Sequence, residues 1–173
     1  MQKIGLLSDT HGYIDPSILD FFSECDQIWH AGDIGNIETF DLISAYKPVK
    51  AVYGNIDGHE LRSTCPQIQR FNCEGADIII THIGGYPGRY DARILPLLQS
   101  STPDIFVCGH SHILKIIYDK KLGLLHLNPG AAGLSGFHNI RTALRFDIDN
   151  GKPLNMQIIE LPRHPKNNNL PNK

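Results

Sequence analysis

The fold class of this chain is decided by the stretch Lys3-Ile4-Gly5-Leu6-Leu7-Ser8-Asp9-Thr10-His11-Gly12. Its first half, residues 3–7, is a short apolar run that stops at a polar segment, as a buried strand ending in a loop does. A helix is predicted next, because Pro16 is tolerated in a first helical turn and apolar residues follow it at helical spacing. The stretch therefore predicts a β-α unit with polar side chains at the carboxyl end of its strand.

The same order of strand, polar loop and helix recurs along the first 110 residues. Strands are expected at residues 27–30, 49–53, 76–81 and 104–108, with an extended stretch at residues 67–72, and helices near residues 37–45 and 92–99. Strands that alternate with helices usually pair in parallel, so this part predicts an α/β sheet.

From residue 114 onward the pattern changes to strand, turn, strand. Strands are expected at residues 114–118, 122–127, 142–148 and 156–161. We expect antiparallel hairpins that form a second sheet. The predicted fold is an αββα sandwich of two sheets, with mixed parallel and antiparallel strands and the helices outside. It forms a single domain over residues 1–161, and residues 162–173 are expected to be a polar tail without a role in chemistry.

Length and composition limit the class of protein. The chain has 173 residues, of which 41% are hydrophobic and 20% charged, as in a soluble globular domain. A net charge of −2 without a run of Lys or Arg argues against bulk binding of nucleic acid. No apolar run approaches the roughly 20 residues of a membrane span, and the N-terminus does not resemble a signal peptide. The four cysteines have no CxxC spacing, so we expect free thiols and a cytoplasmic protein.

Side chains that bind metals follow each of the first five predicted strands in the α/β part. In chain order they are Asp9 and His11, then Asp33, Asn55, His82, and finally His110 and His112. Open α/β sheets place ligands beyond the carboxyl ends of their strands, so these side chains are expected to converge in one cleft. Each Asp or Asn alone has a simpler explanation in turn and cap chemistry, but the ordered set favours a metal site.

The donor types indicate which metals suit such a site. Oxygen and imidazole donors suit Mn, Fe, Zn, Ni or Mg, and four imidazoles argue against a purely Mg²⁺ site. Seven side chains exceed what one ion takes from protein while keeping a position open for water. Two divalent ions that share a bridging carboxylate are therefore predicted, with Mn²⁺ favoured, and such a pair stabilises displacement at phosphorus.

The ordered blocks Asp9-x-His11, Gly32-Asp33, Gly54-Asn55, His82 and Gly109-His110-x-His112 resemble the calcineurin-like metallophosphoesterase superfamily. The short length, residues 7–12, the block Gly54-Asn55-x-Asp57 and the block Asn128-Pro129-Gly130 resemble its small YfcE-type phosphodiesterases. The resemblance covers residues 1–161.

The resemblance implies a metal-dependent phosphodiesterase that hydrolyses a small phosphodiester through a dinuclear metal centre and a bridging hydroxide. It implies two ligand sets with Asp33 as the bridge: Asp9, His11 and His112 for one ion, and Asn55, His82 and His110 for the other. Asn55 and His110 would also lie near the phosphoryl oxygens of the substrate.

One position departs from the superfamily, which usually has a histidine directly after the Gly-Asn block. This chain has Ile56 there. Loss of a general acid costs about 10²–10⁴-fold with a poor leaving group and little with a good one. His59 is the candidate substitute acid, and Arg89, in the glycine-rich loop 84–90, is a candidate substrate-binding residue.

Other histidines are interpreted differently. We expect His30 to pack or hydrogen-bond behind the site, and His126 and His164 to lie away from it. Phe137, His138 and Arg141 follow a run of small residues, and the sequence leaves open whether they form a pocket wall or a contact between protomers.

Two other functions stay open. One is a protein-binding scaffold of the same fold with weak or no catalysis, since the superfamily also resembles the retromer scaffold subunit. The other is a phosphomonoesterase, which the same metals would support. A homodimer or homotetramer is plausible for so small a chain, because assembly is common and can wall a shallow cleft.

Overall fold

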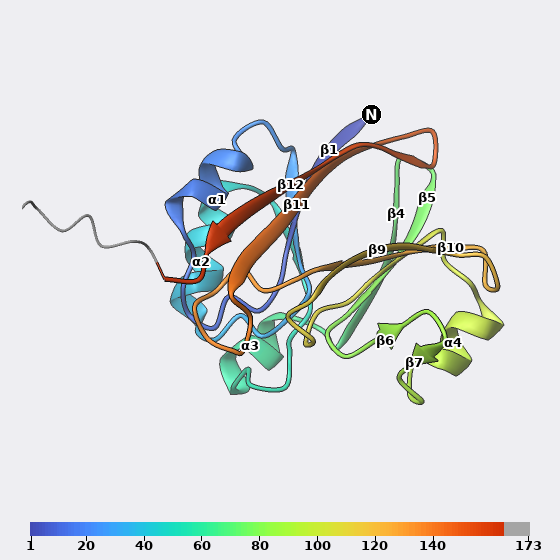
Figure 1. Ribbon diagram of the computed structural model, residues 1–173, viewed down its shortest axis with the longest axis horizontal. Coiled ribbons are helices and arrows are strands. Elements are labelled where there is room, and N and C mark those ends of the chain that lie inside the picture. The colour runs from blue at the N-terminus through green and yellow to red at the C-terminus, as the bar shows by residue number, and fades with distance from the viewer. Residues whose placement is uncertain (165–173) are drawn as a thin grey trace, which may run out of the picture.

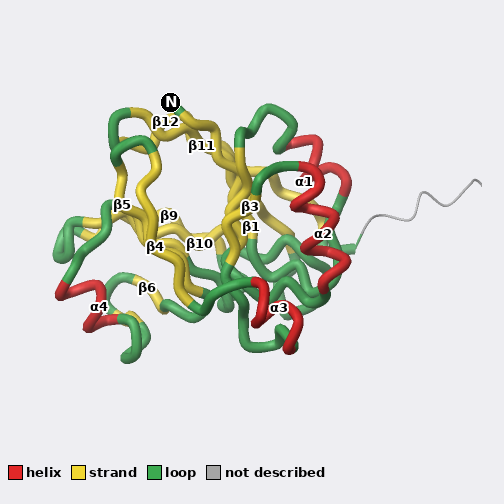
Figure 2. The backbone as a smooth tube through the Cα atoms, turned by 180° about the vertical axis from the view of Figure 1, so that it is seen from behind, coloured by secondary structure: helices red, strands yellow, loops and turns green. Residues whose placement is uncertain are grey.

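Two five-stranded sheets pack face to face in the computed structural model, which describes residues 1–164 (Figure 1). The first sheet has the strand order β12-β11-β1-β2-β3, and the second has the order β4-β5-β8-β10-β9. Helices α1 and α2 cover the outer side of the first sheet, and α4 lies on the outer side of the second, as the reverse view in Figure 2 also shows.

The strands and helices have the following bounds. The first half contains β1 (Gln2–Leu7), α1 (Pro16–Phe21), β2 (Gln27–His30), α2 (Ile37–Tyr46), β3 (Val49–Ala51), α3 (His59–Thr64), β4 (Ile68–Cys73) and β5 (Ala76–Thr81). The second half contains β6 (Gly85–Tyr86), β7 (Arg89–Tyr90), α4 (Leu95–Ser100), β8 (Ile105–Val107), β9 (Leu114–Asp119), β10 (Leu124–Pro129), β11 (Ile140–Asp149) and β12 (Lys152–Pro162).

The first sheet has its parallel strands on one side, and the second sheet has them in its centre. In the first sheet β1, β2 and β3 run parallel, while β11 pairs antiparallel with β1 and β12 with β11. In the second sheet β5, β8 and β10 run parallel, and the edge strands β4 and β9 are antiparallel. The parallel strands therefore deliver the loops that follow β1, β2, β3, β5 and β8 to one edge of the sandwich.

The prediction that the late hairpins form a separate sheet is wrong. The β9–β10 hairpin joins the second sheet through β8, and the β11–β12 hairpin joins the first sheet through β1. An isolated hairpin cannot bury its apolar face, whereas extending an existing sheet places that face in a formed core. Helix α3 and the short β6–β7 hairpin were not expected from the sequence, and the predicted strand 49–53 ends already at Ala51.

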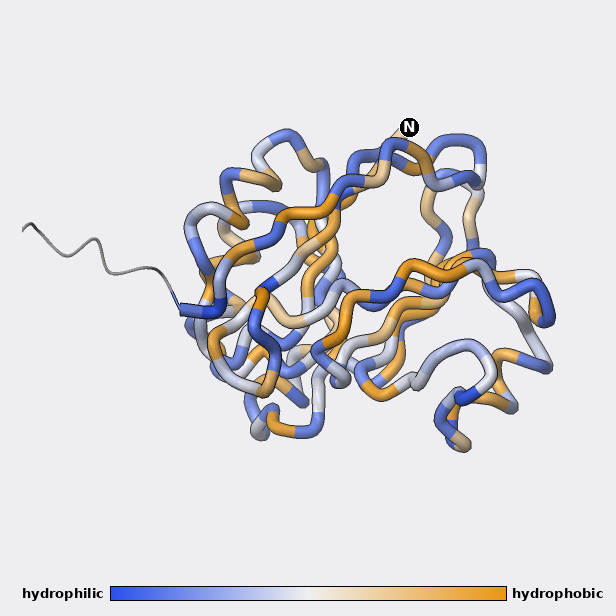
Figure 3. Tube along the Cα trace, viewed as in Figure 1, coloured by the Kyte–Doolittle hydropathy of each residue, from blue (hydrophilic) through white to orange (hydrophobic). Residues whose placement is uncertain are grey.

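The main core lies between the two sheets. Alternation along β1 sends Ile4 and Leu6 into it, while Leu7 faces the helices on the other side. Trp29 packs edge-on against Phe71 of the second sheet and against Phe146 of the first. The apolar stretches accordingly run along the strands in Figure 3.

The helix starts follow from local side-chain bonds. Asp15 caps α1 by accepting from the Ser17 backbone N–H at 2.9 Å, and Pro16 occupies the first turn as predicted. Asn36 caps α2 by accepting from the Thr39 backbone N–H at 2.9 Å.

Several other sequence expectations bear on the whole chain. Within residues 1–164, no helix has the length and apolar character that crossing a membrane requires. The four cysteines are buried and unlinked. Of the predicted tail, Pro162 ends β12 and Arg163 donates to the Leu134 carbonyl at 2.8 Å, while residues 165–173 lie outside the described part.

Candidate metal centre

The loops at the carboxyl ends of the parallel strands are joined by backbone hydrogen bonds. The Asp9 N–H donates to the Gly32 carbonyl and the His11 N–H to the Asp33 carbonyl, both at 3.0 Å. Within the second sheet, the Gly109 N–H donates to the His82 carbonyl at 2.9 Å, and across the sandwich the His110 N–H donates to Asp9 Oδ2 at 3.1 Å. Loops from distant parts of the sequence therefore form one connected edge.

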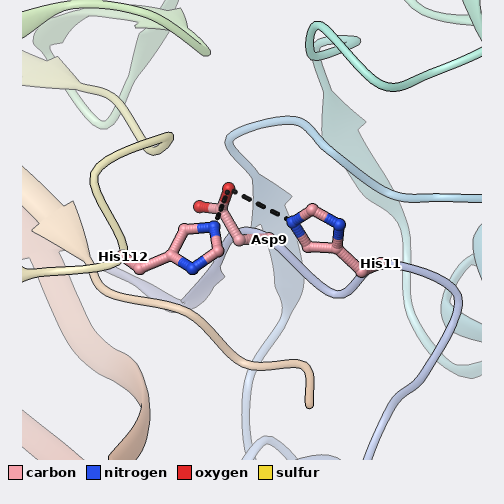
Figure 4. Close-up of side chains that lie close together, drawn as sticks. All are labelled: Asp9, His11 and His112. Atoms are coloured by element: carbon pink, nitrogen blue, oxygen red, sulfur yellow. Dashed lines mark ion pairs between the residues drawn. The ribbon is translucent and has the colours of Figure 1, made fainter. Parts of the chain in front are cut away.

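The first group of potential metal ligands is Asp9, His11 and His112, whose ligand atoms lie within 4.8 Å of one another. Asp9 Oδ1 lies 3.2 Å from His112 Nε2 and 3.9 Å from His11 Nε2. Figure 4 shows the three side chains pointing toward one another from the loops that follow β1 and β8.

The second group is Asp33, His82 and His110, again within 4.8 Å of one another. The Asp33 carboxylate faces both groups, because its Oδ1 lies 3.3 Å from His82 Nε2 and its Oδ2 lies 3.7 Å from His11 Nε2. Asn55 joins the second group, with Oδ1 at 3.0 Å from His82 Nε2. All seven side chains predicted to converge therefore lie in two adjoining groups.

The backbone at these positions is unusual. Five of the seven residues have a left-handed φ between 49° and 66°: Asp9, His11, Asp33, His110 and His112. Such a conformation costs a non-glycine residue on the order of 1–3 kcal/mol, and it concentrates at functional sites. The fold therefore holds these side chains in place at the expense of stability.

Two of the motif glycines give the carboxylates room. A Cβ on Gly109 would overlap Ser8 Oγ and come within 2.9 Å of Asp9 Oδ2. A Cβ on Gly54 would overlap Asp33 Oδ1. The glycines before His110 and Asn55 are thus a steric requirement of the site.

The residues fit a divalent cation. Asp9 Oδ1 and His11 Nε2 are buried and make no hydrogen bond. His82 Nδ1 lies 2.8 Å from the Ala31 carbonyl and donates to it, so in the neutral ring Nε2 presents a lone pair to Asn55 and Asp33 oxygens. Only a proton or a metal ion satisfies acceptors that face one another in this way.

The electrostatics of the cluster point the same way. Burial opposes protonation of His82, but the Asp33 hydrogen bond and the Asp9 charge outweigh it and raise the pKa of the ring. Burial likewise opposes ionisation of Asp33, but His82 and the Ile56 N–H outweigh it and lower the pKa of the carboxyl. The two carboxylates thus create a site that favours positive charge.

The sequence profile of the calcineurin-like phosphoesterase superfamily domain matches residues 2–151. The chain belongs to this superfamily. The resemblance noted in the sequence is thereby confirmed, and it makes the protein a relative of metal-dependent phosphoesterases.

Individual relatives agree with this assignment. A probable metallophosphoesterase of Methanocaldococcus jannaschii is 33% identical over 136 residues, which cover 74% of this chain and 67% of that protein. Vps29 from Entamoeba histolytica, complexed with Zn²⁺, superposes with a TM-score of 0.70 at 17% identity, over 94% of this chain and 99% of that one. A novel archaeal phosphodiesterase superposes with a TM-score of 0.67 at 20% identity, over 92% and 99%. The two structural likenesses show the fold, and the predicted two-sheet sandwich is confirmed.

The sequence did not reveal the role of Asp57 in this protein. Its buried carboxylate accepts three backbone N–H groups, from Gly54 at 2.7 Å, Gly35 at 2.8 Å and Ile34 at 3.1 Å. It thereby ties the loop after β2 to the loop after β3. The block Gly54-Asn55-x-Asp57 was the only signal, and sequence spacing does not show which N–H groups a carboxylate will meet.

His30 lies behind the site as expected. Its Nε2 is 2.9 Å from Thr10 Oγ1, and its Nδ1 accepts from the Gly32 N–H at 3.1 Å. Burial lowers the pKa of His30 to about 4, so the ring is neutral and supports the loop after β2.

Two predicted substrate-side residues lie elsewhere. His59 is exposed in the first turn of α3, and Arg89 is exposed in the β6–β7 hairpin. Neither lines the cavity of about 460 Å³ over the metal-ligand groups. His126 and His164 are also away from that cavity, the former on the outer face of the second sheet and the latter exposed after β12.

The structure distinguishes the three residues that the sequence left open between pocket and protomer contact. Phe137 and His138 line the cavity. Arg141 is buried instead, where its guanidinium pairs with Asp15 Oδ2 at 2.9 Å and donates to the Pro162 carbonyl.

Proposed function

We propose that this chain is a metal-dependent phosphodiesterase that hydrolyses a small phosphodiester at a two-metal site. The observation that carries the proposal is the pair of adjoining ligand groups around Asp33, with Asp9 Oδ1 and His11 Nε2 buried and unbonded. Superfamily membership supports the hydrolysis of a phosphoester.

The proposed ligand sets follow the two groups. Asp9, His11 and His112 would hold one ion, and Asp33 would be shared with the other. Asn55, His82 and His110 complete the second set. Mn²⁺ is the proposed metal, with Fe, Zn, Ni or Mg as alternatives, because mixed oxygen and imidazole donors suit all of these. When bound, the pair would supply an activated water and charge stabilisation at phosphorus.

The charge of the proposed site suits an anionic substrate. Two dications bring +4, and the carboxylates of Asp9 and Asp33 bring −2, so the cleft carries positive charge although the chain has a net charge of −2. Asn55 and His110 are the more exposed members of the cluster, and their side chains would contact the phosphoryl oxygens.

The cavity also indicates what the ester groups are like. Three apolar side chains line it beside the ligands and are exposed: Ile56 by 47%, Ile113 by 56% and Phe137 fully. Exposed apolar side chains around a polar site favour an ester group with an apolar or aromatic face. Ile56 carries no proton for a leaving group, so esters with good leaving groups should react fastest.

A protein-binding scaffold is the second candidate. It is favoured by the edge strand β9, which exposes Ile116, Ile117 and Tyr118 beside an unpaired strand edge. A phosphomonoesterase is the third candidate function. A cytoplasmic location and a homodimer or homotetramer stay predictions from the sequence.

The deciding experiment measures hydrolysis of bis(p-nitrophenyl) phosphate by metal-stripped protein, with Mn²⁺, Mg²⁺, Zn²⁺ or no metal added back. The expected result is turnover only with added metal and little turnover of p-nitrophenyl phosphate. Faster cleavage of the monoester would overturn the diesterase assignment, and no turnover with any metal would favour the scaffold.

A second substrate pair tests the apolar lining. Methyl p-nitrophenyl phosphate has the same leaving group as bis(p-nitrophenyl) phosphate but lacks the second aromatic ring. We expect its KM to be higher, and we expect Phe137→Ala to reduce that difference. Equal KM values for both diesters would contradict a role of the apolar side chains.

A further inference from the structure

The outer nitrogens of His82 and His112 meet different partners. His82 Nδ1 donates to the backbone carbonyl of Ala31, an ordinary partner of a metal-binding imidazole. His112 Nδ1 instead lies 3.2 Å from Nδ1 of His138, and the two rings meet edge to face with centroids 5.1 Å apart. His138 belongs to the loop between β10 and β11, which contributes none of the seven proposed ligands.

The second nitrogen of His138 determines where the protons are. His138 Nε2 lies 3.0 Å from the carbonyl oxygen of Gly133. A carbonyl only accepts, so Nε2 carries the hydrogen, and Nδ1 of the neutral ring is an acceptor. The Nδ1 to Nδ1 contact then requires the proton to be on His112, which leaves the lone pair of that ring on Nε2.

That lone pair is directed at the proposed metal position. His112 Nε2 lies 3.2 Å from Asp9 Oδ1, the buried oxygen that makes no hydrogen bond. Gly133, whose carbonyl contacts His138, is also hydrogen-bonded to Asp9, because the Gly133 N–H donates to the Asp9 carbonyl at 3.0 Å. One loop therefore holds the backbone of Asp9 and, through His138, the ring of His112.

The loop is shaped to allow this contact. Gly136 has a φ of +126°, and a Cβ there would overlap His112 Nδ1 and lie 3.0 Å from His138 Nδ1. Only glycine leaves the two imidazoles free to meet.

We propose that His138 is a positioning residue of the metal centre, which accepts the Nδ1 hydrogen of His112 and so holds the His112 Nε2 lone pair toward the ion beside Asp9. The inference rests on the proposed role of His112 as a ligand. His138 itself does not bind the ion. Removal of such a supporting partner typically costs about 10–100-fold in metal affinity.

The test is calorimetric titration of metal-stripped protein with Mn²⁺ and with Zn²⁺, without substrate. His138→Phe keeps a ring but removes the acceptor, and we expect one of the two ions to bind about 10–100-fold more weakly. His138→Asn places an oxygen close to the Nδ1 position, and we expect it to recover most of the affinity. His164→Phe, an exposed histidine away from the cavity, is the matched control and should bind both ions as the wild type does.

The absorption spectrum of bound Co²⁺ gives a second readout, because it reports ligand geometry. We expect it to change in His138→Phe and to return toward the wild-type spectrum in His138→Asn. Thermal unfolding of the metal-free variants shows whether each one folds. If His138→Phe does not fold, Gly136→Ala separates the same two rings from the other side and should weaken the same ion.

The possible failures are distinct. Wild-type protein that binds no ion would overturn the proposed function and the inference together. Wild-type protein that binds two ions, with His138→Phe binding both equally well, would overturn only the inference. Equal weakening by the Phe and Asn variants would assign His138 a packing role and would also overturn it.

Discussion

Two histidines are almost completely buried in different regions of this protein, and their surroundings differ. His82, 3% exposed, lies at the metal-ligand edge, where its ring meets the Ala31 carbonyl, Asn55 and Asp33. His126, fully buried, lies on the outer face of the second sheet near the rings of Phe106 and Tyr90, and neither of its nitrogens has a partner. The pKa of His82 is raised, whereas burial lowers that of His126 to about 4. Burial alone therefore does not identify a histidine of the metal-ligand edge, whereas burial beside carboxylates does.

The backbone shows the same contrast. Within residues 1–164, eight non-glycine residues have a left-handed φ, and five of them are proposed ligands. The other three lie in turns or at an irregularity of antiparallel strands: Glu74, Asn150 and Asn155. Backbone strain in the antiparallel parts follows from chain reversal or from the register shift between β11 and β12, whereas strain at the metal-ligand edge is explained by a ligand set that must converge.

Asp33→Asn should have the largest effect, because it removes the carboxylate shared by both groups. We expect phosphodiester hydrolysis to fall by about 10³-fold or more, while the metal-free protein still folds. Steady-state rates with added Mn²⁺ measure the loss. Asp41→Asn, on the exposed side of α2, is the control and should keep full activity. A wild-type rate in Asp33→Asn would contradict the two-metal site.

Asp57→Asn should lower stability even though Asp57 is not a proposed ligand. The amide nitrogen cannot accept, so at least one of the three backbone N–H groups loses its partner and the rest lose a charged one. We expect a loss of about 3 kcal/mol in the free energy of unfolding, measured in urea on the metal-free protein. An unchanged midpoint would show that solvent satisfies these N–H groups.

Metal withdrawal should destabilise the ligand edge and leave the His126 region unaffected. At an ion concentration about 100 times the dissociation constant, binding adds about 2.7 kcal/mol of stability. A chelator should therefore lower the Tm of the wild type and of His126→Leu by the same amount. It should have almost no effect on Asp33→Asn, and a similar drop in that variant would count against Asp33 as a ligand.

His126→Leu should have the smallest effect, and only in acid. The folded pKa of His126 is about 4 and its ordinary value is 6.5, so the unfolded chain takes up the proton first as pH falls. Wild-type stability should then decrease by about 2 kcal/mol per buried neutral histidine between pH 7 and pH 5. His30 contributes in the same direction, since its pKa is also about 4. Leu at position 126 should remove roughly half of this decrease, and a pH dependence identical to the wild type would contradict the assignment.

The sequence alone determined which residues lie at the functional edge. A polar side chain after each of five predicted strands sufficed, because the carboxyl ends of parallel strands share an edge whatever the loops do. It also determined that His30 supports the site, since the strand that carries it leads directly into Gly32-Asp33.

Only the tertiary structure decided the contacts that depend on long-range packing. Strand alternation placed His126 on one of two faces, but only the position of α4 and the β6–β7 hairpin made that face a buried one. The hairpins joined different sheets, because a hairpin lowers its free energy at whichever sheet edge it meets. The three N–H groups around Asp57 and the contact of His138 with His112 join loops that are distant in sequence. Hydrogen bonds of this kind have no sequence period, so they exist only once the sheets have brought the loops together.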